Sequence, residues 1–231
     1  MRRIGLLVPS SNTTMEPELY AMAPTGVTIH TARMHLREVT PSGLEEMAGE
    51  ATRGALLLGT AGVDVLVYGC TSGSLLKGPA WERELTQRLV EAAGAPAYTT
   101  AGAVVEALRA LGAEAVSVFT PYVDSINELE RRFLEAMGFQ VSSIKGLGLR
   151  DNRRIGETPP EAVVGLVESA PLEADAVFIS CTNLPSIGLI EPLEERLGVP
   201  VVTSNQASMW IALRGGDTPP VEGYGCLFKH G

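Results

Sequence analysis

Residues 63–74 read VDVLVYGCTSGS, and residues 175–186 read DAVFISCTNLPS. Each stretch is an apolar run that ends at a cysteine, and a threonine and small or turn-forming residues follow. Two further apolar runs, IGLLVP (4–9) and AVSVFTP (115–121), precede them. Continuous apolar runs of this length are typical of parallel strands that are buried on both faces. The pattern therefore predicts an α/β fold.

Longer amphipathic stretches lie between the apolar runs. They predict helices over residues 43–62, 81–94, 103–112 and 127–138. Several of these stretches end at a glycine, which is the usual residue for a left-handed helix stop. Strands that alternate with helices in this way predict small parallel sheets, each flanked by helices.

The two halves of the chain share landmarks in the same order. The matched pairs are Pro9 and Pro121, Cys70 and Cys181, and Thr99 and Thr203, at separations of 112, 111 and 104 residues. Single matches arise by chance among α/β units, whereas three in order indicate an internal duplication. We therefore expect two pseudosymmetric lobes. The first, with Cys70, would contain residues 1–95 plus 205–231, and the second, with Cys181, residues 96–204.

Both cysteines lie where the substrate of such a protein is expected. Ligands of open parallel sheets bind beyond the carboxyl ends of the strands, so we expect the active site in the cleft between the lobes. Free N–H groups and the helix dipole at these turns favour an anion and can lower the pKa of a thiol. We therefore expect a thiolate near neutral pH. Cys226 lacks this context and is expected to be structural.

Small polar residues surround the predicted strand ends. Thr71, Ser72 and Thr182 supply hydroxyls and amides that could hold a carboxylate, and SSNTT (10–14) is either a run of helix caps or an anion cradle. The hydroxyl of Tyr122 could donate to a carboxylate or the ring could pack over a loop. Asn152 lies in a polar loop and by itself is typical of a turn.

Composition limits the classes of partner. The chain has 231 residues, 45% of them apolar, and a net charge of -9, which argues against a nucleic-acid partner. No apolar run is long enough for a signal peptide or a membrane span, so we expect a cytoplasmic protein with reduced thiols. The chain has three histidines and no CxxC or HxxxH motif, so we expect no metal.

Five motifs together carry a family resemblance that covers nearly the whole chain. They are, in order, PSSNTTMEPE, YGCTSGS, FTPY, RDNRRIG and SCTNLPS. This order resembles that of the maleate cis-trans isomerases, within the cofactor-independent superfamily of aspartate/glutamate racemases, hydantoin racemases and arylmalonate decarboxylases. The resemblance implies two pseudosymmetric lobes with a cysteine from each, a small dicarboxylate substrate, no cofactor and a homodimer.

The resemblance also implies roles for individual residues. Cys70 corresponds to the nucleophile, which forms a succinyl-cysteine intermediate between maleate and fumarate, and Cys181 corresponds to the partner acid and base. The substrate-binding positions implied are Asn12, Tyr122 and Asn152, together with the backbone amides around Thr71, Ser72, Thr182 and Asn183.

Other activities of the superfamily stay open at this point. A racemase also uses two thiols, but glutamate-type racemases usually have histidine where Asn183 stands here. A decarboxylase typically has glycine at the position of Cys70, which disfavours that activity. A thiol-based sensor, in which Cys70 and Cys181 form a reversible disulfide, is the alternative outside the enzymes.

Overall fold

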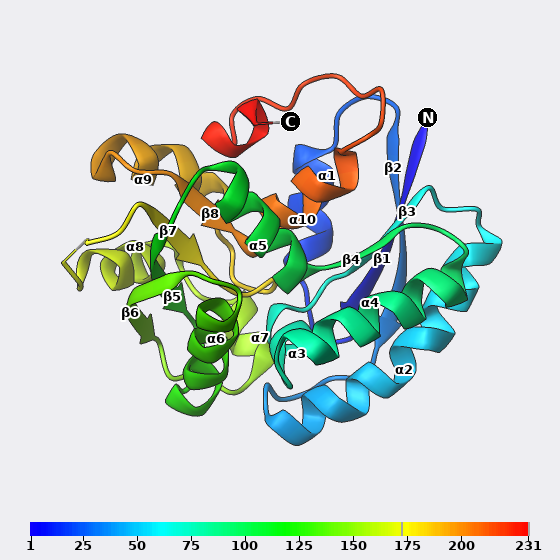
Figure 1. Cartoon of the computed structure of the whole chain (residues 1–231), viewed down its shortest axis with the longest axis horizontal. Coiled ribbons are helices and arrows are strands. Elements are labelled where there is room, and N and C mark those ends of the chain that lie inside the picture. The colour runs from blue at the N-terminus through cyan, green and yellow to red at the C-terminus, as the bar shows by residue number, and fades with distance from the viewer. Residues whose placement is uncertain (172, 231) are drawn as a thin grey trace.

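The protein consists of two parallel sheets, one from each half of the chain (Figure 1). The structure is a computed structural model that describes residues 1–171 and 173–230. The first sheet, in the order β2-β1-β3-β4, contains β1 (Arg2–Pro9), β2 (Val27–Met34), β3 (Val65–Tyr68) and β4 (Ala97–Thr99). The second, in the order β6-β5-β7-β8, contains β5 (Ala115–Thr120), β6 (Gln140–Gly146), β7 (Ala176–Ile179) and β8 (Val201–Thr203). The predicted α/β fold is confirmed.

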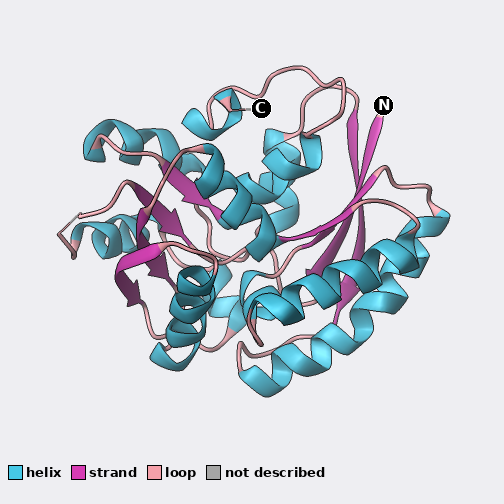
Figure 2. Cartoon of the chain, viewed as in Figure 1, coloured by secondary structure: helices cyan, strands magenta, loops and turns pink. Residues whose placement is uncertain are grey.

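Helices flank both sheets and fill the space between them (Figures 1 and 2). The first half contains α1 (Met15–Met22), α2 (Pro41–Thr60), α3 (Thr71–Leu75), α4 (Pro79–Ala93) and α5 (Thr100–Ala110). The second half contains α6 (Asp124–Ala136), α7 (Asn152–Gly156), α8 (Pro160–Glu168), α9 (Ile190–Leu197) and α10 (Ser204–Leu213), with short 3-10 turns η1 (Ile187–Leu189) and η2 (Cys226–Lys229). In residues 1–171 and 173–230, no helix combines the length and hydropathy that a bilayer crossing requires.

The expected helices are present, but α2 and α4 begin two residues earlier than expected, and α5 and α6 begin three residues earlier. Pro41 and Pro79 occupy the first turns of α2 and α4. Proline has no N–H to lose there, and its fixed φ angle already suits a helix. The first turn of a helix therefore extends N-terminal to its amphipathic pattern.

The strand register agrees with the duplication. Leu7 of β1 pairs with Tyr68 of β3, and Phe119 of β5 pairs with Ile179 of β7. Leu7 and Phe119 are 112 residues apart, and Tyr68 and Ile179 are 111 residues apart. These are the separations of the matched prolines and of the matched cysteines. The two cysteines therefore leave equivalent points of equivalent sheets.

The division between the lobes does not fall neatly in the sequence. Strand β4 pairs with β3 in the first sheet, although it follows the expected boundary at residue 95. Helices α5 and α10, which follow β4 and β8, pack against each other between the sheets. Thr99 and Thr203, the third matched pair, accept hydrogen bonds from Gly102 N–H and Gln206 N–H as the N-caps of these helices. This helix pair joins the two lobes, and Ser204 at the start of α10 contacts both cysteine turns.

Candidate active site

Cys70 lies at the end of β3, where the chain enters α3. It is the N-cap residue of α3, and its Sγ accepts a hydrogen bond from the Gly73 N–H at 3.4 Å. The Ser72 hydroxyl lies 3.8 Å from the same sulfur atom. Only 5% of Cys70 is exposed. Hydrogen-bond donors thus surround a thiol that is held away from bulk water.

Cys181 occupies the equivalent place after β7, with a strained backbone. Its φ angle is 100°, and it is the only non-glycine residue with a positive φ in the described part of the chain. Such a conformation costs about 1–3 kcal/mol and persists only where the surrounding structure enforces it, most often at functional sites. The Cys181 Sγ accepts a hydrogen bond from the Asn183 N–H at 3.4 Å. The strained backbone therefore distinguishes Cys181 from the residues around it and makes it a candidate functional residue.

Hydrogen bonds connect the two cysteine turns. Thr71 Oγ1 lies 2.8 Å from Ser204 Oγ, and the Cys181 N–H donates to the same Ser204 oxygen at 3.0 Å. In the opposite direction, the Thr182 hydroxyl donates to the Gly69 carbonyl at 3.0 Å. The two thiols are close enough that charge on one raises the pKa of the other. The duplication thus brings both thiols to one buried region.

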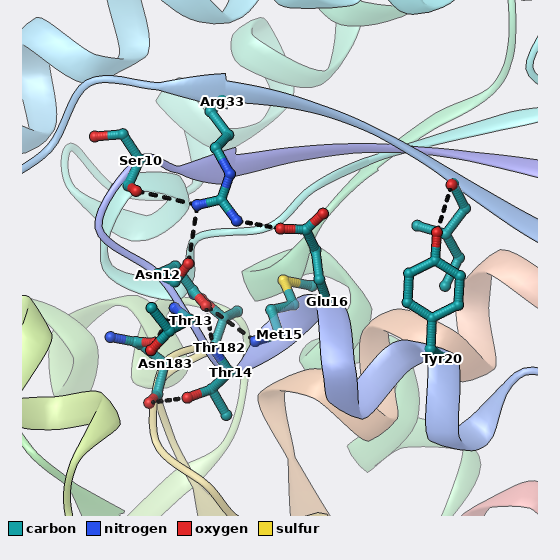
Figure 3. A network of polar contacts seen from close by, with 11 residues as sticks. Ser10, Asn12, Thr13, Thr14, Met15, Glu16, Tyr20, Arg33, Thr182 and Asn183 are labelled. Atoms are coloured by element: carbon teal, nitrogen blue, oxygen red, sulfur yellow. Dashed lines mark hydrogen bonds and ion pairs between the residues drawn. The ribbon is translucent and has the colours of Figure 1, made fainter.

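Asn12 connects the first turn of the first lobe to the Cys181 turn (Figure 3). Its Oδ1 accepts hydrogen bonds from the N–H groups of Thr14 and Met15, at 3.0 and 2.9 Å. Its Nδ2 donates to Thr182 Oγ1 at 3.0 Å. Asn12 is 1% exposed, so this amide is fixed on both sides. It presents a rigid, neutral polar group beside the second thiol.

Asn183 and Asn152 extend the same network. The Thr13 N–H donates to Asn183 Oδ1, and the Thr14 hydroxyl donates to the Asn183 carbonyl, both at 2.9 Å (Figure 3). Asn183 Nδ2 donates to the Asn152 carbonyl, and Asn152 Nδ2 donates to Ser11 Oγ at 2.9 Å. These contacts hold the start of α7 against both lobes. Asn152, which resembles an ordinary turn residue in the sequence, is 3% exposed.

The expected low thiol pKa is wrong for this structure. Burial raises the pKa of the Cys70 thiol to about 11, although hydrogen bonds from Gly73 and Ser72 oppose the change. Burial likewise raises the pKa of Cys181 to about 12, against a hydrogen bond from the Tyr122 hydroxyl. The donors at the start of the five-residue helix α3 do not offset the loss of water. The raised pKa values favour the protonated form of both thiols at neutral pH.

A buried carboxylate braces the Cys181 loop from the first lobe. Glu18 Oε1 accepts hydrogen bonds from the N–H groups of Ser186 and Ile187, at 2.8 and 3.3 Å. Its Oε2 accepts a hydrogen bond from Asn205 Nδ2 at 2.6 Å, and the same amide donates to the Thr182 carbonyl at 3.0 Å. Burial raises the pKa of Glu18, and these donors oppose that change. The loop after Cys181 is therefore fixed by the opposite lobe.

Substitution of Gly73 by alanine is expected to displace the Cys70 turn. A Cβ at Gly73 would lie 2.9 Å from the Tyr68 hydroxyl and from Met47 Cε, and 3.2 Å from Cys70 Sγ. Because this region is fully buried, we expect Gly73→Ala to lower the free energy of unfolding by about 1–3 kcal/mol. Urea denaturation followed by circular dichroism measures this change.

Gly49→Ala is the matched control. Gly49 lies within α2, and no atom outside that helix approaches its Cβ position within 4 Å. Alanine in an open helical position stabilises a protein by about 0.5–1 kcal/mol. If Gly73→Ala proved as stable as Gly49→Ala, the crowding around Cys70 described above would be wrong.

The structure brings all the sequence-predicted site residues together. They are Cys70, Cys181, Asn12, Thr71, Ser72, Tyr122, Asn152, Thr182 and Asn183, and each is at most 5% exposed. Their individual roles stay predictions. Sequence reasoning missed Ser204 and Glu18, which connect the lobes. Ser204 directly follows the matched Thr203, so closer attention to that landmark would have indicated it.

Known proteins are similar to this chain over almost its full length. Residues 4–228 match the model of the arylmalonate decarboxylase family. A maleate isomerase of Nocardia farcinica is 36% identical, covering 99% of this chain and 96% of that protein. An arylmalonate decarboxylase of Bordetella bronchiseptica is 32% identical, covering 96% and 91%.

Solved structures give the same result. A maleate isomerase variant from Pseudomonas putida S16, crystallised with maleate, superimposes with a TM-score of 0.95 at 32% identity and covers 99% of this chain and 98% of that one. A serine-for-cysteine mutant of the Nocardia farcinica maleate cis-trans isomerase, with a covalently bound succinylcysteine intermediate, has a TM-score of 0.94 at 34% identity and covers 100% and 99%. By sequence and by structure, the chain belongs to the family of maleate isomerases and arylmalonate decarboxylases.

Proposed function

We propose that this protein is a cofactor-independent isomerase that converts maleate to fumarate. The observation that carries the proposal is the convergence of Cys70 and Cys181, from equivalent strand ends, on one buried region joined through Ser204. The relatives named maleate isomerase, at 36% and 35% identity, support the same activity. So does the solved relative that carries a succinylcysteine.

The first half of the reaction adds a thiol across the double bond. The Cys70 thiol first gives its proton to solvent. The Cys70 thiolate then forms a bond to one olefinic carbon of maleate, and Cys181 gives its proton to the neighbouring carbon. The product is a succinyl thioether on Cys70 and a thiolate on Cys181. Because each thiol alone has a high pKa here, this proton donor is protonated when the substrate arrives.

The second half reverses the addition after rotation. The former double bond is now single, so the two carboxylates can rotate to opposite sides. The Cys181 thiolate then removes the proton, the carbon–sulfur bond breaks, and fumarate leaves with Cys70 as the thiolate. Covalent catalysis in this form replaces one step with a high rotational barrier by an addition and an elimination with lower barriers.

Neutral groups would bind the carboxylates. We assign this role to the side chains of Asn12, Tyr122 and Asn152 and to the backbone N–H groups around Thr71, Ser72, Thr182 and Asn183. Fixed N–H and O–H donors stabilise charge that develops on a carboxylate during the addition, because they need no reorganisation. The burial and mutual hydrogen bonds of these side chains support such preorganisation.

The proposal includes the setting of the enzyme. We expect a small dicarboxylate as its substrate, a homodimeric assembly and a cytoplasmic location, with neither nucleic acid nor membrane as a partner. The net charge of -9 supports the expectation about nucleic acid. We also propose the division into lobes at residues 95/96 and 204/205, with β4 contributed to the first sheet.

Proton NMR tests the proposed activity. Purified, reduced protein is incubated with maleate in deuterated buffer without any cofactor, and we expect the fumarate singlet to appear. Absence of fumarate would contradict the proposal. The same protein would then be given aspartate, hydantoins and arylmalonates, where exchange of the α-proton would indicate a racemase and loss of a carboxyl group a decarboxylase.

A further inference from the structure

Glu130 is a buried carboxyl group that the proposed reaction does not use. It lies on α6 and is 0% exposed. Its Oε1 accepts a hydrogen bond from the Ser180 hydroxyl at 2.6 Å, and Ser180 directly precedes Cys181. Within residues 1–171 and 173–230, its Oε2 has no hydrogen-bond partner. A fully buried carboxyl with one donor is costly, so its retention beside Cys181 calls for a reason.

The duplication gives Glu130 a counterpart in the other lobe. Glu18 and Glu130 are separated by 112 residues, as Pro9 and Pro121 are, and each follows its proline by nine positions. Glu18 accepts hydrogen bonds from three N–H donors and braces the loop after Cys181. Glu130 receives only one. The two equivalent carboxyls therefore differ in how far the protein stabilises their charge.

Among the described residues, no Lys, Arg or His side chain lines the cavity that borders Glu130. The cavity is small, and the lining includes Thr71 and Leu75 from α3, Val104 from α5 and Phe178 from β7. Burial raises the pKa of Glu130 to about 7, and the Ser180 hydrogen bond offsets this only in part. The neutral carboxyl of Glu130 is therefore favoured to a higher pH than that of an exposed glutamate.

The charge of Glu130 reaches the candidate active site. Burial raises the pKa of the Tyr122 phenol most, and charge on Cys181, then on Glu130 and on Cys70, raises it further. Tyr122, Cys181 and Cys70 are all acids, and so is the buried Tyr68, whose pKa is raised by burial and by charge on Cys70. An anionic Glu130 adds a negative charge to a site of low dielectric that must accept a dianion.

We propose that Glu130 is a positioning residue that holds Ser180 and Cys181 in place, and that its ionisation weakens the binding of the dicarboxylate. This inference rests on the proposed isomerase function and deepens it. The neutral carboxyl keeps its contact with Ser180 and leaves the site uncharged. The anion keeps that contact and repels the substrate carboxylates. Substrate affinity, rather than the chemical step, is therefore the quantity that Glu130 controls.

Steady-state kinetics of Glu130→Gln test this inference. Initial rates of fumarate formation at several maleate concentrations, from pH 6 to pH 8, give KM and kcat separately. From pH 6 to pH 8, KM of both proteins can change. We expect the factor by which KM of the parent protein rises to be roughly threefold to tenfold larger than the factor for Glu130→Gln. The two proteins are compared with each other at each pH, because maleate itself loses a proton near pH 6 and this affects both proteins equally. We expect kcat of the two proteins to follow the same pH dependence.

Glu128→Gln is the matched control. Glu128 lies on the same helix, its side chain is 50% exposed, and it pairs with Arg132 on the surface. The same chemical change at this position is expected to leave the pH dependence of KM as in the parent. A purely structural role of Glu130 would instead change kcat or the melting temperature equally at every pH. An identical rise of KM in the parent and in Glu130→Gln overturns the inference.

Ser180→Ala gives a second test that does not depend on the folding of Glu130→Gln. It removes the hydrogen bond that lowers the pKa of Glu130, so the rise in KM should move to a higher pH. A rise that stays in place overturns the inference. Formation of fumarate by the parent decides the proposed function separately. If no fumarate forms, calorimetric titration with maleate at pH 6 and pH 8 tests the role of Glu130 in binding. The absence of any maleate binding would overturn both the proposed function and the inference about Glu130.

Discussion

Cys70→Ala is expected to lose the conversion of maleate to fumarate, by roughly four orders of magnitude or more in kcat. The proposed mechanism forms its only carbon–sulfur bond at Cys70, and alanine offers no nucleophile in its place. Without this bond the double bond of maleate keeps its full rotational barrier. Proton NMR of the variant and the parent at equal concentration measures the loss.

A control must show that Cys70→Ala loses turnover because it lacks the thiol and not because it is unfolded. Cys226→Ser serves as the control, because Cys226 is the third free thiol of the described chain and contacts Glu194 instead of the site. We expect Cys226→Ser to turn over maleate as the parent does. Circular dichroism should show all three proteins folded. Turnover by folded Cys70→Ala within tenfold of the parent would contradict covalent catalysis at this residue.

Cys181→Ser is expected to accumulate the covalent intermediate. Release of fumarate requires a base that removes a proton from carbon, and a buried serine hydroxyl is a far weaker acid than the thiol, so its alkoxide does not form. Addition can still proceed slowly with a proton from water. After incubation with maleate, intact-mass spectrometry should show a protein heavier by one molecule of maleic acid, and peptide analysis should place the addition on Cys70.

The double variant provides the critical comparison for this prediction. Cys70→Ala combined with Cys181→Ser should show no mass increase, because it lacks the nucleophile. Normal turnover by Cys181→Ser would contradict the role of Cys181 as acid and base. An adduct on another residue would contradict the assignment of Cys70. Turnover and the site of the adduct thus test the two thiols independently.

Much of the fold followed from local features of the sequence. Apolar strands, the residues at their ends and the spacing of the matched prolines, cysteines and threonines are all visible without knowledge of contacts. The strand order and register agree with the resulting duplication. The place of β4 did not follow, because three residues such as Ala97–Thr99 carry too little pattern to show which sheet they join.

The candidate site was predictable where chemistry and position coincided in the sequence. Cys70 and Cys181 combine a reactive side chain with the end of a buried strand. Glu18 and Glu130 give no such signal, since glutamates on helices are usually exposed. Glu18 is buried where α1 meets the loop after Cys181, and Glu130 is buried where α6 meets Ser180 and α3, which only the tertiary structure shows.

Strand patterns and turn residues are local properties, so they already indicate a duplicated α/β protein with a thiol at each equivalent strand end. The protonation of those thiols is not a local property. The turn alone favours a thiolate, whereas burial raises the pKa of Cys70 to about 11. The loss of water depends on what the whole fold places around a group, and at this depth it outweighs the local donors.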